Sequence, residues 1–308
     1  MANQSAVTLL APVAITDAMF ASSSVAEPDS GETAWNAATN YSTGTIATRA
    51  TTHRKYKNAI SGVDATLPEN APTRWLDAGP TNKWAMFDQY VNTATTSTGT
   101  QTHVINPGIA TALDFYGLQG TTLTVVIKDG PGGTTISTTT VPLIRDVTDW
   151  YTFLFTTPKQ KTSASVNGFR PVATPEITIT LTPKDGFAKI GQLAIGTAIT
   201  INPTLGGAQY GATAQPVDYS YFKGADDGTF TIVKRGSATN IKAKVFLAIA
   251  DADTALKTVQ ALLSVPVSLR CTDANGYEGL SGYGLVSASL SYDGPSHAIL
   301  DIDQRGIV

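Results

Sequence analysis

Three pairs of closely spaced carboxylates are the residues best suited to do chemistry in this sequence. They are Asp226 with Asp227, Asp251 with Asp253, and Asp301 with Asp303. Two carboxyl groups that flank a glycosidic bond can act as general acid and as base or nucleophile in its hydrolysis. The pairs also fit a hairpin turn, the start of a helix and the solvent face of a strand, in that order. We therefore expect no enzymatic activity, and glycan depolymerisation is kept as the last alternative.

Other nucleophiles and metal ligands occur singly. His53, His103 and His297 lie in separate thirds of the chain, outside any H-E-x-x-H spacing, and no serine lies in a G-x-S-x-G elbow. The single Cys271 excludes an internal disulfide and a thiolate metal cluster. Residues 273–279 carry oxygen ligands spaced loosely like a calcium loop, but without the full pattern they favour a tight turn. We predict no catalytic residue, metal or cofactor.

The elements that carry these residues are expected to be mainly β-strands. The run "TLTVVIKD" (residues 122–129) is strand-like, and in "PEITITLTP" (residues 175–183) isoleucine and leucine alternate with threonine. The run "DWYTFLFTTP" (residues 149–158) is interpreted as a further strand. Strands of this length separated by turns are typical of an antiparallel β-sandwich.

The last third of the chain has a different pattern. Residues 220–236 indicate a β-hairpin, and "AKVFLAIA" (residues 243–250) indicates a buried strand. Asp253 can cap a following helix, because acidic side chains accept hydrogen bonds from the first turn. Its apolar face would consist of Leu256, Val259, Leu262 and Leu263. Strand, helix and strand in this order predict a small α+β domain.

The predicted fold class is therefore mainly β and multidomain. Residues 1–80 are expected to form a small β module that includes the N-terminal strands. Residues 81–202 are expected to form an antiparallel, jelly-roll-like β-sandwich, and residues 203–308 a C-terminal α+β assembly domain. A chain of 308 residues exceeds what one core usually supports, so several domains are expected.

Composition limits the classes of partner. Hydrophobic residues make up 42% of the chain and charged residues 15%, below the roughly 25% of an average globular protein. Such surfaces suit a protein that is covered by neighbours. A net charge of −3 without a large basic cluster argues against nucleic-acid binding, and no apolar run is long enough for a membrane span. The N-terminus lacks a basic region before its apolar stretch, so we expect folding in the cytoplasm.

Aromatic residues gather in the first domain. Trp35, Tyr41, Tyr56 and Trp75 could form an exposed platform on which a sugar stacks, or they could be the core of the module. The two alternatives predict exposed and buried rings, respectively. Trp35, Tyr41 and Tyr56 are accordingly the candidate glycan or interface aromatics.

The aromatic series resembles the small chitin-binding modules of bacterial chitinases. The matching positions run from Trp35 to Trp75 and comprise Trp35, Tyr41, Gly44, Tyr56, Lys57, Ala59, Pro68 and Trp75. Those modules usually carry exposed tryptophans after the Tyr and Ala, where this chain has Ile60, Ser61 and Gly62. The resemblance implies a small carbohydrate-module-like scaffold without that sugar platform.

Over its whole length the chain resembles structural proteins of tailed-bacteriophage tails and baseplates. The motif "WLDAGPTNKWAMFD" and the ending "SYDGPSHAILDID" carry this resemblance. In the first motif Trp75 would close the small module and Trp84 would begin the sandwich, with Gly79 and Pro80 as the bend between them. These four residues are the predicted interdomain seam. The sandwich itself is similar to galactose-binding-like jelly rolls, a fold that serves both as glycan reader and as spacer.

The resemblance implies a virion protein at the tail tip, baseplate or fibre attachment point. Its expected work is protein–protein assembly as an oligomer, with host attachment through surface contact as an added role. Expected partners are copies of itself and other phage tail proteins, and a host surface glycan is a candidate ligand. The expected location is the virion tail, after assembly in the host cytoplasm. The competing hypothesis is a carbohydrate-binding receptor-recognition adhesin.

Overall fold

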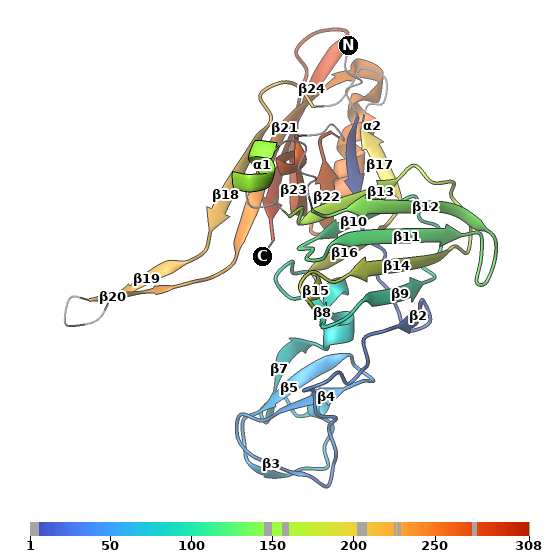
Figure 1. The fold of residues 1–308 in the computed structure, drawn as a ribbon. Helices are drawn as coiled ribbons and strands as arrows, with labels where there is room; N and C mark the ends of the chain where they lie inside the picture. Colours follow the sequence, from blue (N-terminus) through green and yellow to red (C-terminus); the bar gives the residue numbers. More distant parts are fainter. Residues whose placement is uncertain are drawn as a thin grey trace.

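The computed structural model is mainly β, with antiparallel pairing between all its named strands (Figure 1). It describes residues 6–144, 150–155, 160–201, 208–224, 226, 229–272 and 276–307. Three bodies follow one another in Figure 1: a small β module, a β-sandwich, and a seven-stranded sheet that carries one helix. The mainly β, multidomain fold class predicted from the sequence is confirmed.

The sandwich packs a five-stranded sheet against a three-stranded sheet. The first has the order β12 (Thr135–Pro142), β11 (Thr122–Lys128), β14 (Glu176–Thr182), β9 (Gln101–Ile105), β2 (Phe20–Ser23), and the second β13 (Ser163–Asn167), β10 (Ala112–Tyr116), β16 (Gln192–Gly196). A short pair, β8 (Thr95–Ser97) and β15 (Ala188–Ile190), lies beside them. In β14, Ile177, Ile179 and Leu181 are buried while the intervening threonines are not, as the alternation predicts.

The seven-stranded sheet holds the second large core. Its order is β17 (Ala198–Ile201), β1 (Val7–Leu10), β22 (Pro266–Arg270), β23 (Ser281–Ser291), β24 (His297–Gly306), β21 (Ser237–Ala248), β18 (Thr213–Asp218). Helix α2 (Ile249–Ala261) covers one face of this sheet, and a 3₁₀ turn, η3 (Glu278–Leu280), precedes β23. Ala255 and Val259 of the helix pack with Val245, Leu269 and Leu300 of the sheet.

The two N-terminal strands, β1 and β2, lie outside the small module. The sequence predicts both in the small module, but β1 lies between β17 and β22, and β2 lies at the edge of the five-stranded sheet. The apolar content of β1 explains its position. Leu9 joins the helix-covered core, whereas Leu10 packs on the other side against the sandwich. Because both faces of β1 carry apolar side chains, the strand buries both of them between two packed layers.

The three-stranded sheet of the sandwich is therefore a middle layer. Leu113 and Phe115 of β10 enter the sandwich core, while Ala112 and Tyr116 point to the opposite face. There Tyr116 packs near Tyr283 of β23, with ring centroids 6.0 Å apart. Every residue of β10 and of β16 is buried, because both faces of this sheet are covered.

The small β module has its own aromatic core. Its strands β4 (Ile46–Arg49), β5 (Arg54–Asn58) and β7 (Trp75–Pro80) form one sheet, and β3 (Asn40–Tyr41) pairs with β6 (Gly62–Val63). Tyr41, Ala47, Tyr56 and Trp75 are buried together. The 3₁₀ turns η1 (Pro68–Asn70) and η2 (Asn82–Phe87) lie within and after the module. Figure 1 shows the module at one end of the molecule, joined to the sandwich near η2.

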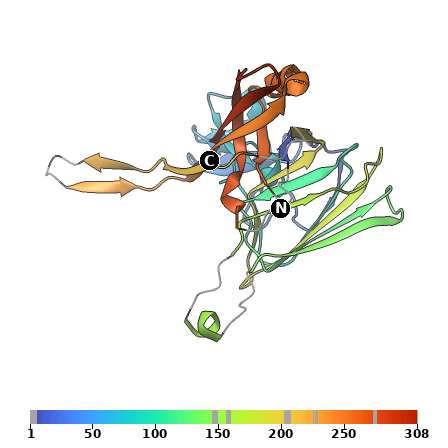
Figure 2. The ribbon, with the colours of Figure 1, turned by 90° about the horizontal axis from the view of Figure 1, so that it is seen from above.

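A long hairpin arm leaves the seven-stranded sheet. Strand β18 continues into β19 (Tyr221–Gly224), which pairs with β20 (Phe230–Val233), and the chain returns through β21. Figures 1 and 2 show this arm projecting away from the rest of the molecule. The hairpin predicted over residues 220–236 is confirmed, and the views add that it lies outside any core.

Two predicted elements need correction. Residues 150–155 of the expected strand form a short helix, α1 (Trp150–Phe155), with Tyr151, Leu154 and Phe155 exposed; a short apolar run does not distinguish strand from helix. Helix α2 begins before Asp253, so Asp253 is not its cap. The buried face of α2 contains Ala252, Ala255, Val259 and the following Leu262, whereas Leu263 is exposed.

Candidate functional site

The predicted glycan aromatics lie mostly inside the small module. Tyr41 and Tyr56 are buried beside Trp75, and the rings of Tyr41 and Trp75 meet edge to face with centroids 5.0 Å apart. Trp35 is partly buried, with the guanidinium of Arg49 over its ring at 5.1 Å. Because sugar stacking needs an open ring face, Tyr41 and Tyr56 have no face to offer.

The four predicted seam residues link the small module to the sandwich. Trp75 is in the core of the module, and Trp84 is in the core of the sandwich, against the rings of Phe20 and Phe87. Gly79, near the end of β7, has a φ of 97°, a conformation that a side chain would strain. Pro80 ends the strand.

A polar cluster holds this seam together. We define the seam cluster as Asp17, Glu27, His53, Thr81 and Trp84. The Glu27 carboxylate accepts hydrogen bonds from the Trp84 indole at 3.0 Å and from the Thr81 hydroxyl at 2.7 Å. The imidazole of His53 stacks on the Trp84 ring, with centroids 4.0 Å apart and planes at 23°. Three separate segments of the chain thus meet at one carboxylate.

A second polar contact lies beside the seam cluster. The Asn82 side chain donates to Asp29 and to the Thr96 carbonyl, and the Asn82 backbone N–H donates to Glu32 at 2.9 Å. Lys55 of the small module lies 3.8 Å from the Glu32 carboxylate. A hollow of about 340 Å³ is lined by these residues. Each charged side chain of the hollow already has a hydrogen-bond or ion-pair partner, so the hollow has the chemistry of a structural joint.

The junction between the sandwich and the seven-stranded sheet contains a chain of buried hydrogen bonds. Ser268 of β22 donates to the Asp114 carboxylate at 2.6 Å, and the Tyr116 hydroxyl lies 2.6 Å from the same serine oxygen. Since the serine proton is directed at Asp114, Tyr116 must be the donor to Ser268. The Arg270 guanidinium lies 3.8 Å from Asp114. Burial, and next the charge of Asp114, raise the pKa of the Tyr116 phenol, which therefore keeps its proton.

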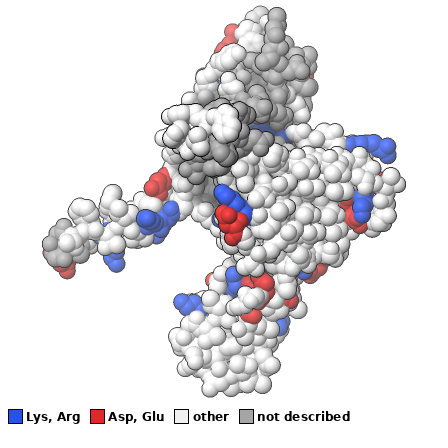
Figure 3. All heavy atoms as spheres, in the orientation of Figure 1, with Lys and Arg blue, Asp and Glu red and all other residues white. Residues whose placement is uncertain are grey.

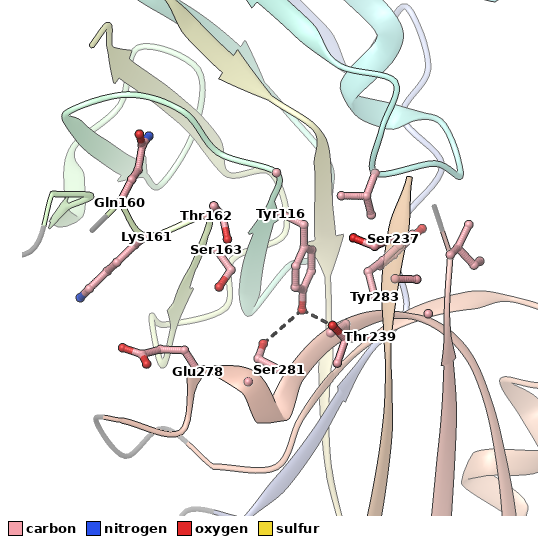
Figure 4. Close-up of a pocket in the computed structure, with 17 residues that line it drawn as sticks. Tyr116, Gln160, Lys161, Thr162, Ser163, Ser237, Thr239, Glu278, Ser281 and Tyr283 are labelled. Carbon is pink, nitrogen blue, oxygen red and sulfur yellow. Dashed lines mark hydrogen bonds between the residues drawn. The ribbon is translucent and has the colours of Figure 1, made fainter. Parts of the chain in front are cut away.

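A cavity of about 570 Å³ opens beside this chain of hydrogen bonds (Figure 4). Hydroxyl side chains from both bodies line it: Tyr116, Thr162, Ser163, Ser237, Thr239, Ser281 and Tyr283. Lys161 and Glu278 supply charges of opposite sign. Burial raises the pKa of Tyr283 to about 12, so this phenol is a hydrogen-bond donor at neutral pH. The hydroxyl groups of the lining could hold a polar, uncharged molecule through hydrogen bonds.

The carboxylate pairs have structural roles where the structure describes them. Asp301 and Asp303 lie 3.4 Å and 3.1 Å from Lys244 and Lys242 on the neighbouring strand. Asp253 accepts a hydrogen bond from the Tyr292 hydroxyl. Asp226 is exposed in the tip of the arm, and Asp227 lies outside the described residues. In the described part of the chain, no group of three or more acidic, histidine or cysteine side chains could hold a metal ion.

The remaining titratable candidates are dispersed. His103 is fully buried in β9, and burial lowers its pKa to about 4, so the ring is neutral. His297 stacks on Phe246, with ring centroids 4.7 Å apart. Cys271 is buried, and burial raises its pKa to about 12, which makes the thiol unreactive. Residues 273–275 of the loosely calcium-like segment lie outside the described part.

The arm has an exposed apolar face that was not predicted from the sequence. Phe222, Phe230 and Ile232 are 71%, 70% and 56% exposed. Ile232 pairs directly with Phe222, and Gly224 pairs with Phe230, so the three side chains share one face of the ribbon. We call these three residues the arm face. The signal was present in the sequence, because a hairpin with apolar residues at every second position needs a surface to cover it.

Charged groups are sparse over the face shown in Figure 3, where white residues predominate. No helix in the described part of the chain is long and apolar enough to cross a membrane. In comparisons with protein-family models, curated proteins and solved structures, no match to this chain was found.

Proposed function

We propose that this chain is a structural component of a bacteriophage tail, at the tail tip, baseplate or fibre attachment point. Its activity is protein–protein assembly with copies of itself and with other tail proteins. The motifs "WLDAGPTNKWAMFD" and "SYDGPSHAILDID" support the tail assignment, and the low charge supports surfaces that are covered by neighbours. The observation that carries the assembly role is the arm face.

The arm cannot be explained as part of the folded core of a single chain. An isolated two-stranded hairpin is at best marginally stable in water, and stable hairpins pack an apolar face on something. Phe222 and Phe230 contact each other edge to face, with centroids 6.0 Å apart, yet both remain largely exposed. Exposed aromatic side chains on a projecting element are typical of protein–protein contacts.

The opposite face of the arm is arranged differently. There the Arg235 guanidinium lies 4.9 Å from the centre of the Tyr221 ring, which covers part of that ring and keeps a charge at the surface. The arm therefore has one apolar face and one mixed face. This asymmetry favours docking through Phe222, Phe230 and Ile232.

The assembly role is tested by changing the arm face without touching the core. The double variant F222S/F230S should be monomeric by light scattering and mass photometry under conditions where the wild-type chain forms oligomers. Its thermal unfolding should match the wild type, because neither ring is buried. The variant I109S is a matched control, since Ile109 is 60% exposed but lies outside the arm. A wild-type chain that stays monomeric at high concentration and is missing from purified particles would refute the proposal.

A carbohydrate-binding adhesin is the second candidate function, favoured by the hydroxyl-lined cavity at the junction (Figure 4). Polar side chains that converge in a cavity at a domain boundary are common in ligand sites. A glycan array with the full chain tests this function. Binding that is lost in S237A and T239A would support it, and an array without signal would remove it. Glycan depolymerisation would require loss of hydrolysis in D226N, D251N or D301N.

A further inference from the structure

The seam cluster places an acidic side chain at each ring nitrogen of His53. Nδ1 of His53 lies 3.1 Å from both Glu27 carboxylate oxygens, and Nε2 lies 3.1 Å from Oδ2 of Asp17. A neutral imidazole has one N–H and can donate to only one of these carboxylates, whereas an imidazolium donates to both. With both carboxylates ionised, the hydrogen bonds of the cluster are therefore complete only when His53 carries a positive charge.

The two carboxylates differ in how strongly they depend on that charge. The side chain of Glu27 is 6% exposed and that of Asp17 is 73% exposed. Water can solvate Asp17 when His53 is neutral, but it reaches little of Glu27. Thr81 and Trp84 give Glu27 two neutral donors, and His53 gives it the countercharge. A buried carboxylate that loses its countercharge is destabilised much more than an exposed one.

The nearby charges on other elements have their own partners. The ammonium of Lys83 lies over the Phe20 ring at 5.0 Å, and Arg54 forms an ion pair with Asp77 at 2.6 Å. Lys55 faces Glu32. Asp17 and Glu27 are thus the titratable groups that face the His53 ring among the described residues, one from the segment before β2 and one from the segment after it.

The cluster also connects two bodies of the fold. His53 belongs to the turn between β4 and β5 of the small module, while Trp84 is fixed in the sandwich core. The His53 backbone has a φ of 55°, in the left-handed region that non-glycine residues rarely occupy. The backbone N–H of Thr81 donates to the His53 carbonyl at 2.9 Å, which holds this turn against the sandwich. A change in the contacts of His53 therefore changes the orientation of the small module relative to the sandwich.

We propose that the seam cluster is a proton-controlled lock on the small β module. With His53 protonated, its ring joins Asp17 to Glu27 and stacks on Trp84, and the module has one orientation. Loss of that proton removes one hydrogen-bond donor and leaves Glu27 without its countercharge. The module then turns more freely about the connection between Pro80 and Thr81. The lock is closed while His53 carries its proton, and it opens when a rise in pH removes that proton.

The test measures the distance between the small module and the sandwich. Ala65 in the module and Thr138 in β12 are exposed, and the native Cys271 is buried, so labels on A65C and T138C react selectively. Single-molecule energy transfer, recorded in steps from acidic to alkaline pH, should show one narrow distance population at the acidic end and a broad one at the alkaline end. The ratio of the narrow population to the broad population should fall about tenfold from the acidic to the alkaline end. This change corresponds to the free energy of about one charge-assisted hydrogen bond.

Two variants separate the lock from general effects of pH. In H53Q the distance distribution should be independent of pH, because the amide does not titrate. In H297Q, which changes a histidine outside the seam, the wild-type pH transition should persist. Nitrogen chemical shifts of the wild-type histidines give a readout that does not depend on a variant folding. His53 should be doubly protonated in the narrow population, and a neutral His53 there would overturn the proposal. So would a wild-type distance that does not change with pH, or a transition that survives in H53Q.

Discussion

The Tyr116 hydroxyl and the Ser268 hydroxyl lie 2.6 Å apart and join two bodies that are far apart in the sequence. Tyr116 is in the middle sheet of the sandwich, and Ser268 is in β22 of the seven-stranded sheet. Ser268 in turn donates a second hydrogen bond to the Asp114 carboxylate. The junction between the two larger bodies is therefore a specific polar contact within an apolar surround of Leu10, Ala112 and Ala194.

Removing the Tyr116 hydroxyl should weaken this junction. In Y116F the buried Ser268 oxygen loses a hydrogen-bond donor, and the free energy of unfolding should decrease by about 1–3 kcal/mol. Urea denaturation followed by tryptophan fluorescence measures the change. Y90F is the matched control, because Tyr90 is exposed and its substitution should change stability by less than about 0.5 kcal/mol. Equal stability of Y116F and the wild type would show that the hydroxyl contributes nothing to the junction.

Buried His103 should make the sandwich sensitive to acid. Its pKa is lowered from 6.5 to about 4 in the folded chain, so between these values the unfolded state binds a proton that the folded state does not. The free energy of unfolding is therefore highest above about pH 6.5. It decreases as the pH falls towards 4, by about 3 kcal/mol in total.

The comparison of H103Q with the wild type isolates this effect. The difference in unfolding free energy between pH 7 and pH 4.5 should be smaller in H103Q, whatever its absolute stability. H297Q should keep the wild-type difference, because His297 is only partly buried at the start of β24. An H103Q chain with the same acid sensitivity as the wild type would contradict the assignment of His103 as a neutral buried base.

The N-terminal strand should stabilise the seven-stranded sheet, rather than the small module that follows it in sequence. Leu9 is fully buried in the helix-covered core, so L9A should cost about 2–5 kcal/mol. Hydrogen exchange should accelerate in β17 and β22, which flank β1, and remain unchanged in β5 and β7. The control L76A removes an exposed leucine of the small module and should leave both patterns intact. Faster exchange confined to the small module would refute the placement of β1.

Local patterns predicted the elements well where one face of a strand is buried. The alternation in β14 and in β11 indicated the sandwich strands, and the hairpin of the arm was identified from its turn. The N-terminal strands were misplaced because their partners, Ile201 and Leu269 for β1, are remote in the sequence. Nothing in the four residues of β1, three of them apolar, specifies which sheet they join.

The candidate sites were harder to predict for the same reason. The sequence left open whether Tyr41 and Tyr56 form an exposed sugar platform or the core of the module, and the structure places them in the core. The seam cluster brings Glu27, His53 and Trp84 together from three segments, and no spacing in the sequence indicates that arrangement. The arm face was visible as alternating apolar residues, but only the fold shows that no core lies beneath it.

Photocrosslinking from the arm face tests the assembly role most directly. A photoreactive amino acid at Phe230, irradiated in intact phage particles, should give crosslinked peptides that join the arm to a second copy of this chain or to another tail protein. The same group at Ile109 should give few such products. Absence of the chain from the particles, or crosslinks from Phe230 that stay within one copy, would contradict the account.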